Sequence, residues 1–281
     1  MSKALNVIKA ILVVGLLLCI IAFGMIQIAS STILSQSYVL NQLEEANYYA
    51  NIYTEIKSDF ENYIYQSGLD ESVLENIITV EDVTNDTKQI ISNIYNGDNK
   101  KIDVTALKER LNKNIEESLK GQRINMSTQR AIDEFVNKIA DQYIETMSHT
   151  NFEKNINDIY TKVKEYVELG NKVIIVVIGM MVIAILAIQY KKIFRNFALI
   201  GISFTGSGLF YIFVNMFVNS KIKIENIVIL NDAISIVLRN VLTNIVNTIN
   251  QYGWIFFGIG IVLIVIGNIL NNKKTKKEEN F

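Results

Sequence analysis

Four long apolar stretches without a charged side chain dominate the chain, and segments that carry Lys or Arg separate them. The stretches occupy residues 10–28, 173–188, 197–218 and 253–270. A helix needs about 20 apolar residues to cross a hydrocarbon core of about 30 Å. The pattern therefore predicts an integral membrane protein whose spans cover residues 10–30, 172–190, 197–218 and 252–270.

Residues 31–171, between the first two predicted spans, have the periodicity of helices. Apolar side chains recur every three or four positions, and no stretch alternates with a period of two. The first such stripe contains Val39, Leu43, Ala46, Tyr49, Tyr53, Ile56, Phe60 and Tyr63. It predicts one long helix over residues 32–66, which at about 1.5 Å per residue would be roughly 50 Å long.

Capping residues and glycines divide the rest of this segment into shorter helices. The predicted helix starts are Asp70, Thr79, Asp103, Ser127 and Thr150, and the predicted stops are Gly68, Gly97 and Gly121. Thr79 with Asp82, and Thr150 with Glu153, have the spacing of capping boxes. The last helix runs toward span two, with Gly170 as a candidate interruption. Because the chain contains no proline, we expect an antiparallel bundle whose first and last helices continue spans one and two.

Two of these helices have clear apolar stripes. The stripes are Leu107, Leu111, Ile115 and Leu119, and Ile132, Phe135, Ile139, Tyr143 and Met147. Residues 219–251 form a second segment between spans, in which Asp232 is a predicted cap for an amphipathic helix. This helix could lie in the membrane interface or pack under the bundle. Its polar face carries only Arg239 as a charge, which favours packing against the bundle.

The basic residues predict the orientation of the spans. If the spans alternate in direction, nine Lys and Arg residues fall on one side, in residues 1–9, 191–196 and 271–281. Cytoplasmic loops carry such an excess, so both termini are predicted to be cytoplasmic in the plasma membrane. Residues 31–171 carry 14 Lys and Arg against 24 Asp and Glu, which fits an extracytoplasmic location. The same acidity makes nucleic-acid binding improbable, since phosphate contacts need clustered cations.

Two further features of the first span leave alternatives open. A basic start and the small residues at 29–31 are also found in cleavable signal peptides, although the apolar run is longer than usual. The lone cysteine, Cys19, lies inside this span and is interpreted as a small apolar filler. With one cysteine no intramolecular disulfide can form, so residues 31–171 must be held together by packing alone.

Candidate catalytic groups are few. His149, the only histidine, shares a helical arc with Asp141 and Glu145, but the arc lies opposite the apolar stripe and nothing nearby completes a zinc site. Adjacent carboxylates such as those at 44–45, 116–117 and 133–134 diverge by about 100° on a helix and do not converge on a substrate. No hydrolase or phosphate-binding motif is present. We therefore expect no enzyme, cofactor or metal.

The third span is the most polar of the four. The candidate helix-packing or partner face on it consists of Gly201, Ser203, Thr205, Ser207 and Asn215. Small residues four positions apart let neighbouring helices approach closely, within one protein or between two. The same surface could line the path of a small polar solute. No span contains the ionisable side chains that proton relays and coupled transporters need.

Two segments resemble known sequences. Residues 35–53, which are rich in tyrosine, and residues 103–111 resemble multi-span membrane proteins of low-GC bacteria that place a helical domain directly after the first span. The two segments make up about a fifth of residues 31–171. It implies a helical domain on the outer side of the membrane.

These observations predict an all-α protein with four transmembrane helices and a large extracytoplasmic helical bundle at residues 31–171. The expected function is non-enzymatic, with the outer bundle binding, sensing or scaffolding at the bacterial cell envelope. The expected partners are the lipid bilayer and another membrane or envelope protein, and not nucleic acid. The alternative is a channel or transport accessory subunit that uses the polar face of span three.

Overall fold

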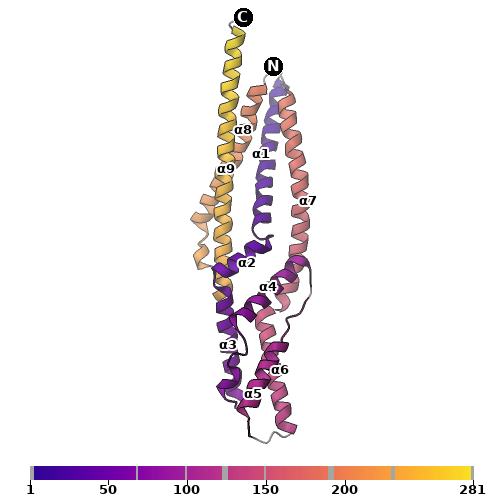
Figure 1. The fold of residues 1–281 in the computed structure, drawn as a ribbon. Helices are drawn as coiled ribbons and strands as arrows, with labels where there is room; N and C mark the ends of the chain where they lie inside the picture. Colours follow the sequence, from indigo (N-terminus) through magenta and orange to yellow (C-terminus); the bar gives the residue numbers. More distant parts are fainter. Residues whose placement is uncertain are drawn as a thin grey trace. The chain divides into compact units, whose positions relative to one another are not determined.

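The computed structural model describes residues 3–67, 69–98, 100–121, 126–148, 150–188, 193–228 and 232–279. These residues form nine α-helices and two short 3₁₀ helices, with no strand among them (Figure 1). The helices are α1 (Lys3–Ser31), α2 (Gln36–Glu45), α3 (Tyr48–Ser67), α4 (Val80–Asn96), α5 (Thr105–Ser118), α6 (Met126–Ser148), α7 (Thr150–Ile188), α8 (Ile193–Lys221) and α9 (Asp232–Glu279). The 3₁₀ helices are η1 (Glu71–Leu74) and η3 (Ile224–Asn226). The prediction of an all-helical fold is confirmed.

The chain divides into two compact units. The first, here called the membrane unit, consists of Met1–Ser35, Lys164–Ile227 and Leu238–Phe281. The second, the bundle unit, consists of Gln36–Val163 and Val228–Val237. Four helices are long and apolar enough to cross a membrane, namely α1, α7, α8 and α9. This confirms the predicted number of apolar helices, although the apolar part of α9, Ala233–Asn272, is much longer than the predicted span 252–270.

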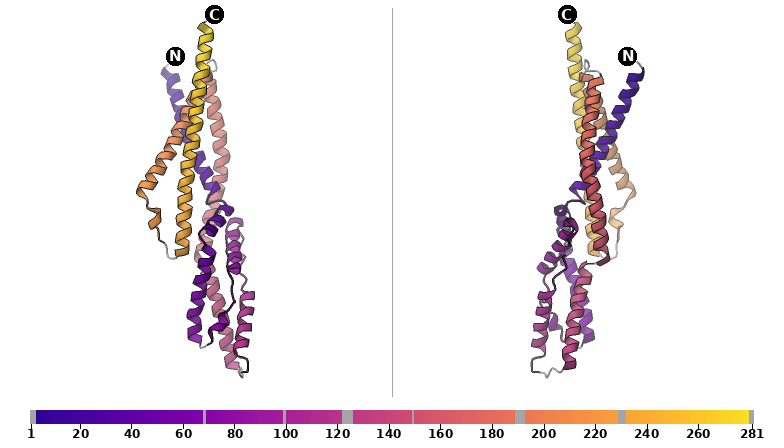
Figure 2. Two further views of the ribbon diagram at one scale, coloured as in Figure 1. Left: turned by 60° about the vertical axis from the view of Figure 1, so that its left-hand side comes forward. Right: turned by 90° about the vertical axis from the view of Figure 1, so that its right-hand side faces the viewer.

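Within the membrane unit, the contacts give each helix its direction. Gly15 and Gly170 of α1 and α7 lie against Met181 and Ile26 of the opposite helix, so these two helices run antiparallel. In the views of Figure 2, the start of α1 and the end of α9 lie at the same end of this unit. The directions of neighbouring spans thus alternate along the chain.

The bundle unit has its own apolar core, built from α3 to α6 and η1. Leu107, Leu111 and Ile115 of α5 are almost fully buried, as the sequence predicts. On α6, Ile132, Ile139, Tyr143 and Met147 are buried as predicted, and Phe135 is partly buried against the same core. Burial of this many aliphatic side chains is the main source of stability for a unit that has no disulfide.

The predicted helix ends are mostly confirmed in the bundle unit. Thr79 and Asp82 form the predicted capping box at the start of α4. Helix α4 stops at Gly97, which has a φ of 73°, a left-handed conformation that favours glycine. Asp70 caps η1, and the Asp103 side chain accepts from the Thr105 N–H at 3.0 Å just before α5. Gly68 lies outside the described residues.

The prediction of one helix over residues 32–66 is wrong. The chain leaves helical geometry after Ser31, where the Thr32 hydroxyl donates to the Ile28 carbonyl at 2.6 Å. It leaves it again between α2 and α3, where Asn47 has a φ of 51°. Asparagine tolerates this left-handed conformation better than most residues, so one position can divide a continuous apolar pattern.

The break at Asn47 also changes which side chains of α3 are buried. Ile52, Ile56, Phe60 and Ile64 are at most 1% exposed. They are spaced by four, so they form a straight row along α3. The tyrosines of the predicted stripe lie at the edge of this row and are half-buried, because the helix turns its aliphatic side chains to the core.

Two long helices pass through positions that the sequence treats as boundaries. Helix α7 continues through Gly170, which contradicts an interruption there. Helix α9 starts at Asp232, as predicted, but continues without a break through the whole fourth span. Without proline, a single glycine lowers helix stability by only about 1 kcal/mol, which tertiary packing can offset.

Candidate functional site

Helix α8 carries the candidate face, and the structure places part of it against α1. The Ser203 hydroxyl donates to the Val13 carbonyl at 2.9 Å, and the Ser207 hydroxyl to the Leu17 carbonyl at 3.0 Å. Tyr211, which the sequence analysis did not single out, continues the series by donating to the Ile21 carbonyl. From one bond to the next, the residue numbers on α1 and on α8 both increase by four, so the two helices run parallel. We call this series the hydroxyl ladder.

The other small residues of the candidate face, Gly201 and Thr205, lie against α9, and so does Gly208, which is not a member of that face. A Cβ added to Gly201 would lie 2.7 Å from the Gly260 carbonyl oxygen, and one added to Gly208 would lie 2.7 Å from the Gly253 carbonyl oxygen. Thr205 packs directly on Gly260. Residue numbers rise along α8 as those of the facing residues of α9 fall, so these helices run antiparallel. At the glycine positions the two backbones are too close for any side chain larger than hydrogen.

Asn215 lies nearer the end of α8 and is not part of the ladder. Its side-chain amide donates to the Val246 carbonyl of α9 at 2.9 Å, and its oxygen accepts from Asn219 at 3.2 Å. The Thr205 hydroxyl is buried and has no hydrogen-bond partner among the described residues. The five candidate residues thus occupy two surfaces of α8, one facing α1 and one facing α9.

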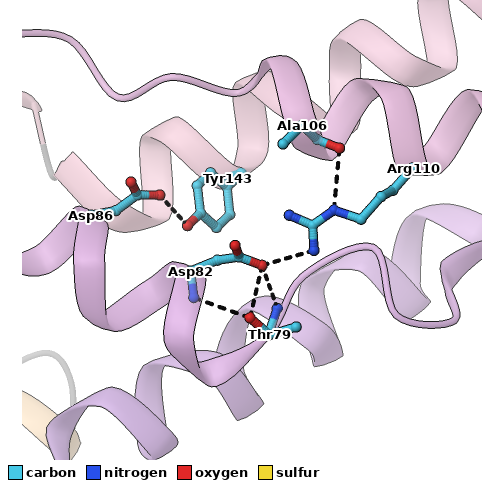
Figure 3. A network of polar contacts seen from close by, with 6 residues as sticks. All are labelled: Thr79, Asp82, Asp86, Ala106, Arg110 and Tyr143. Atoms are coloured by element: carbon cyan, nitrogen blue, oxygen red, sulfur yellow. Dashed lines mark hydrogen bonds and ion pairs between the residues drawn. The ribbon is translucent and has the colours of Figure 1, made fainter.

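A polar network in the bundle unit joins three helices (Figure 3). Asp82 of α4 accepts from the Thr79 N–H at 2.8 Å and forms an ion pair with Arg110 of α5 at 2.9 Å. Burial alone would raise the pKa of Asp82, but the hydrogen bonds from Arg110 and Thr79 outweigh it and lower the pKa below its ordinary value. The capping carboxylate therefore also ties α5 to the start of α4.

The second half of this network joins α4 to α6. The Tyr143 hydroxyl donates to the Asp86 carboxylate at 2.5 Å (Figure 3). Burial raises the pKa of Asp86, the bond from Tyr143 opposes the rise, and repulsion from Asp82 and Asp103 adds to it. Burial and the bond to Asp86 raise the pKa of Tyr143, which keeps its proton available for donation. The sequence placed Tyr143 in the core but gave no signal for its partner, 57 residues away.

A further polar cluster connects α3 and α6. The Gln142 side chain accepts from the Tyr63 hydroxyl at 3.0 Å and donates to Asp59 at 3.2 Å. The Lys138 ammonium lies over the Tyr63 ring, 4.9 Å from its centroid. Each of these groups has a partner within the bundle unit, so the cluster orients helices.

The predicted acidic arc can be located only in part, because His149 lies outside the described residues. Asp141 and Glu145 are exposed on α6, on the side away from Tyr143. The described side chains contain no group of three or more His, Cys, Asp or Glu residues that could hold a metal ion. The adjacent carboxylates at 44–45, 116–117 and 133–134 are also exposed.

Four apolar helices define the class of this chain, an all-helical, multi-pass integral membrane protein. Comparison with protein-family models found no match. Searches of curated proteins and of solved structures also found no similar protein. The resemblance to multi-span proteins of low-GC bacteria therefore stays a prediction, and inferences about function depend on the geometry described above.

Proposed function

We propose that this is a non-enzymatic protein of the bacterial plasma membrane whose helical bundle, residues 31–171, lies on the extracytoplasmic side and scaffolds another envelope protein. The proposal gives the membrane unit the role of an anchor and the bundle unit the role of a binding module. Both termini and the basic residues at 191–196 would be cytoplasmic. The nine basic residues in residues 1–9, 191–196 and 271–281 support this orientation.

The observation that carries the proposal is that polar side chains of α8 are hydrogen-bonded to the backbone of adjacent helices. The hydroxyls of Ser203 and Ser207 are bonded to carbonyls of α1, and Asn215 is bonded to α9. Polar groups in a membrane span are costly unless they have partners, and here the partners are backbone atoms of adjacent spans. These bonds hold adjacent helices of the membrane unit together, which supports the role of an anchor.

The alternative of a channel or transport accessory has less support for the same reason. Of the polar side chains that would line a path along α8, those of Ser203, Ser207 and Asn215 already have partners within the protein, and among the described residues only the buried Thr205 hydroxyl of this face has none. Solute flux through proteoliposomes that is abolished by Ser207→Leu with Asn215→Leu would favour the alternative and count against an anchor.

The orientation can be tested with single cysteines in a Cys19→Ala background. We expect a cysteine at Lys100 to react with a membrane-impermeant maleimide on intact cells. A cysteine at Lys192 should react only after permeabilisation, and the background protein should not react. Labelling of both positions from the same side, or the reverse pattern, would contradict the proposed topology.

The scaffold role can be tested with a photo-crosslinking residue placed on the bundle surface. Tyr65 is 75% exposed on α3, and Ile183, 67% exposed on α7 within a span, is the matched control. In native membranes, the probe at Tyr65 should yield one discrete protein adduct that the probe at Ile183 does not give. If both positions yield only lipid adducts or none, the protein has no partner at this surface and the scaffold role is wrong.

A further inference from the structure

The charges at the far end of α8 do not belong to the basic excess that predicts orientation. Of the 27 Lys and Arg residues, nine lie in the predicted cytoplasmic segments and 14 lie in residues 31–171. The remaining four are Lys172, Lys221, Lys223 and Arg239. Two of these four, Lys221 and Lys223, lie in a single short segment, residues 221–227, at the end of α8. A third, Arg239, contacts this segment from α9.

Residues 221–224 alternate between cationic and apolar side chains at the end of a candidate span, and the exposed Glu225 follows them. Lys221 is the last residue of a candidate span, and Lys223 follows it two positions later. Both are exposed, as is Ile222 at 49%. No ion pair joins either ammonium to a carboxylate of the described side chains. A span that ends at Lys221 would place both lysines at the depth of the lipid headgroups and Ile222 beside the acyl region.

The segment is also held in place. The Arg239 guanidinium of α9 donates to the Glu225 carbonyl at 3.1 Å, which ties the short helix η3 to the first turns of α9. Apolar side chains on the last turns of α8 provide a surface for acyl chains, since Phe213 and Phe217 are each 64% exposed. A fixed cationic site above an exposed aromatic surface matches the two halves of a phospholipid.

We propose that residues 221–227 bind the phosphate headgroup of an anionic phospholipid, in the leaflet opposite to the one that holds the nine basic residues. Lys221 and Lys223 would contact the phosphate, and Ile222 would contact its acyl chains. A zwitterionic lipid carries a compensating cation in its headgroup, so it should bind less well. The inference depends on the membrane class of the protein and not on which leaflet is outer, so a failed topology experiment would leave it standing.

The only tryptophan of the chain reports on this leaflet. Trp254 is 58% exposed on α9, next to Gly253, which packs against Ile212 of α8. Ile212 lies nine residues before Lys221, or about 14 Å along the helix axis. A lipid whose phosphate lies at Lys221 would therefore have the middle of its acyl chains at the depth of Trp254, where bromine atoms on chains that reach this exposed side chain would quench its fluorescence.

The experiment compares brominated phosphatidylglycerol with brominated phosphatidylcholine in vesicles that contain both lipids in equal amounts. The full-length protein should show stronger quenching when the phosphatidylglycerol is brominated. Each lysine should contribute up to about fivefold in relative binding. K221Q with K223Q should bring the two quenching levels together, K221R with K223R should keep them apart, and high salt should reduce the difference.

A matched control removes two exposed lysines of the bundle unit, Lys100 and Lys120, in the variant K100Q with K120Q. It has the same loss of net charge and should keep the selectivity of the natural protein. Equal quenching by both lipids in the natural protein would overturn the proposal. So would a selectivity that survives K221Q with K223Q, since a cation elsewhere would then be responsible.

Discussion

The close approach of α8 and α9 can be tested by adding one methyl group at a time. At Gly208, a Cβ would lie 2.7 Å from the Gly253 carbonyl oxygen and 2.8 Å from the Phe257 Cα, both of them backbone atoms. Backbone cannot rotate away, so Gly208→Ala must push the two helices apart. At Gly258 of α9, by contrast, an added Cβ would meet nothing within 4 Å. Gly258→Ala is therefore a matched control with the same chemical change.

The expected magnitudes follow from two opposing effects. Replacing glycine by alanine within a helix stabilises it by about 0.5–1 kcal/mol, and this gain applies at both positions. Overpacking an already close interface costs about 1–3 kcal/mol, and this cost applies only at Gly208. The free energy of unfolding should therefore be lower for Gly208→Ala than for Gly258→Ala by about 1–3 kcal/mol. Gly206→Ala should be intermediate, because its Cβ would meet the flexible end of the Leu17 side chain at 2.6 Å.

Cys19 gives a reporter for this measurement without any engineering. It is the only cysteine of the chain and lies in α1, where its sulfur is 3.9 Å from that of Met181 in α7. A thiol-reactive fluorescent dye should therefore react fully only when the spans separate. In detergent solution, heating should release the thiol at a temperature about 2–12 °C lower for Gly208→Ala than for Gly258→Ala.

One result would refute the reasoning. If Gly208→Ala raises the transition temperature as much as Gly258→Ala does, the helices have room for a methyl group and the close backbone approach is wrong. A lower temperature for both variants would instead show that glycine is needed for a reason other than packing. Circular dichroism before heating should show that the helix content of all variants is unchanged.

Three further predictions concern hydrogen bonds in the two units. The Asn114 side chain donates to the Val73 and Glu75 carbonyls at 3.0 and 2.8 Å, so Asn114→Ala should lower the free energy of unfolding of the bundle unit by about 1–3 kcal/mol. Asn112 is exposed, so Asn112→Ala should change this free energy little. Denaturant titration followed by circular dichroism measures both variants, and equal effects would contradict the prediction. Asp86 has a raised pKa in the folded state, so its contribution to stability is full below its unfolded pKa of about 3.9 and is lost as pH rises through the folded value. Asp86→Asn should accordingly be more stable than the natural protein at pH 7, with a difference that disappears toward pH 3 in thermal melts; a difference that grows on acidification would contradict the raised pKa. Ser207→Ala should lower the free energy of unfolding by about 0.6 kcal/mol, and at most by about 1.7 kcal/mol, in the same Cys19 assay. The expected loss is small because the Ser207 hydroxyl also bonds the Ser203 carbonyl of its own helix at 2.8 Å. A loss well above this range would mean that the ladder contributes more than a typical membrane hydrogen bond.

The sequence was sufficient for features that depend on neighbouring residues. The spans follow from uninterrupted apolar stretches, and the capping box at Thr79 follows from two side chains three positions apart. The buried stripe of α5 follows from Leu107, Leu111 and Ile115 at helical spacing. In each case the energy that decides the structure comes from residues within a few turns of one another.

Other features depend on contacts that no local pattern contains. Asn47 is one of many asparagines in the chain, and only tertiary packing of α2 and α3 selects it for a left-handed turn. Tyr143 and Asp86 look like an ordinary core aromatic and an ordinary surface acid until α4 and α6 are brought together. For the candidate face of α8, the small residues could be recognised, but their division between α1 and α9 could not, because hydropathy does not tell which span lies beside which.

The hydroxyl ladder has a consequence for how the chain is made. Each of its bonds joins residues 190 positions apart, so α1 leaves the ribosome long before its parallel neighbour exists. At about 5–20 residues per second, the wait is roughly 10–40 s. Throughout this time α1 lacks its contact with α8, while the whole bundle segment is synthesised. Correct assembly therefore requires that the first helix insert stably alone and that its contact surface stay unoccupied until the third arrives.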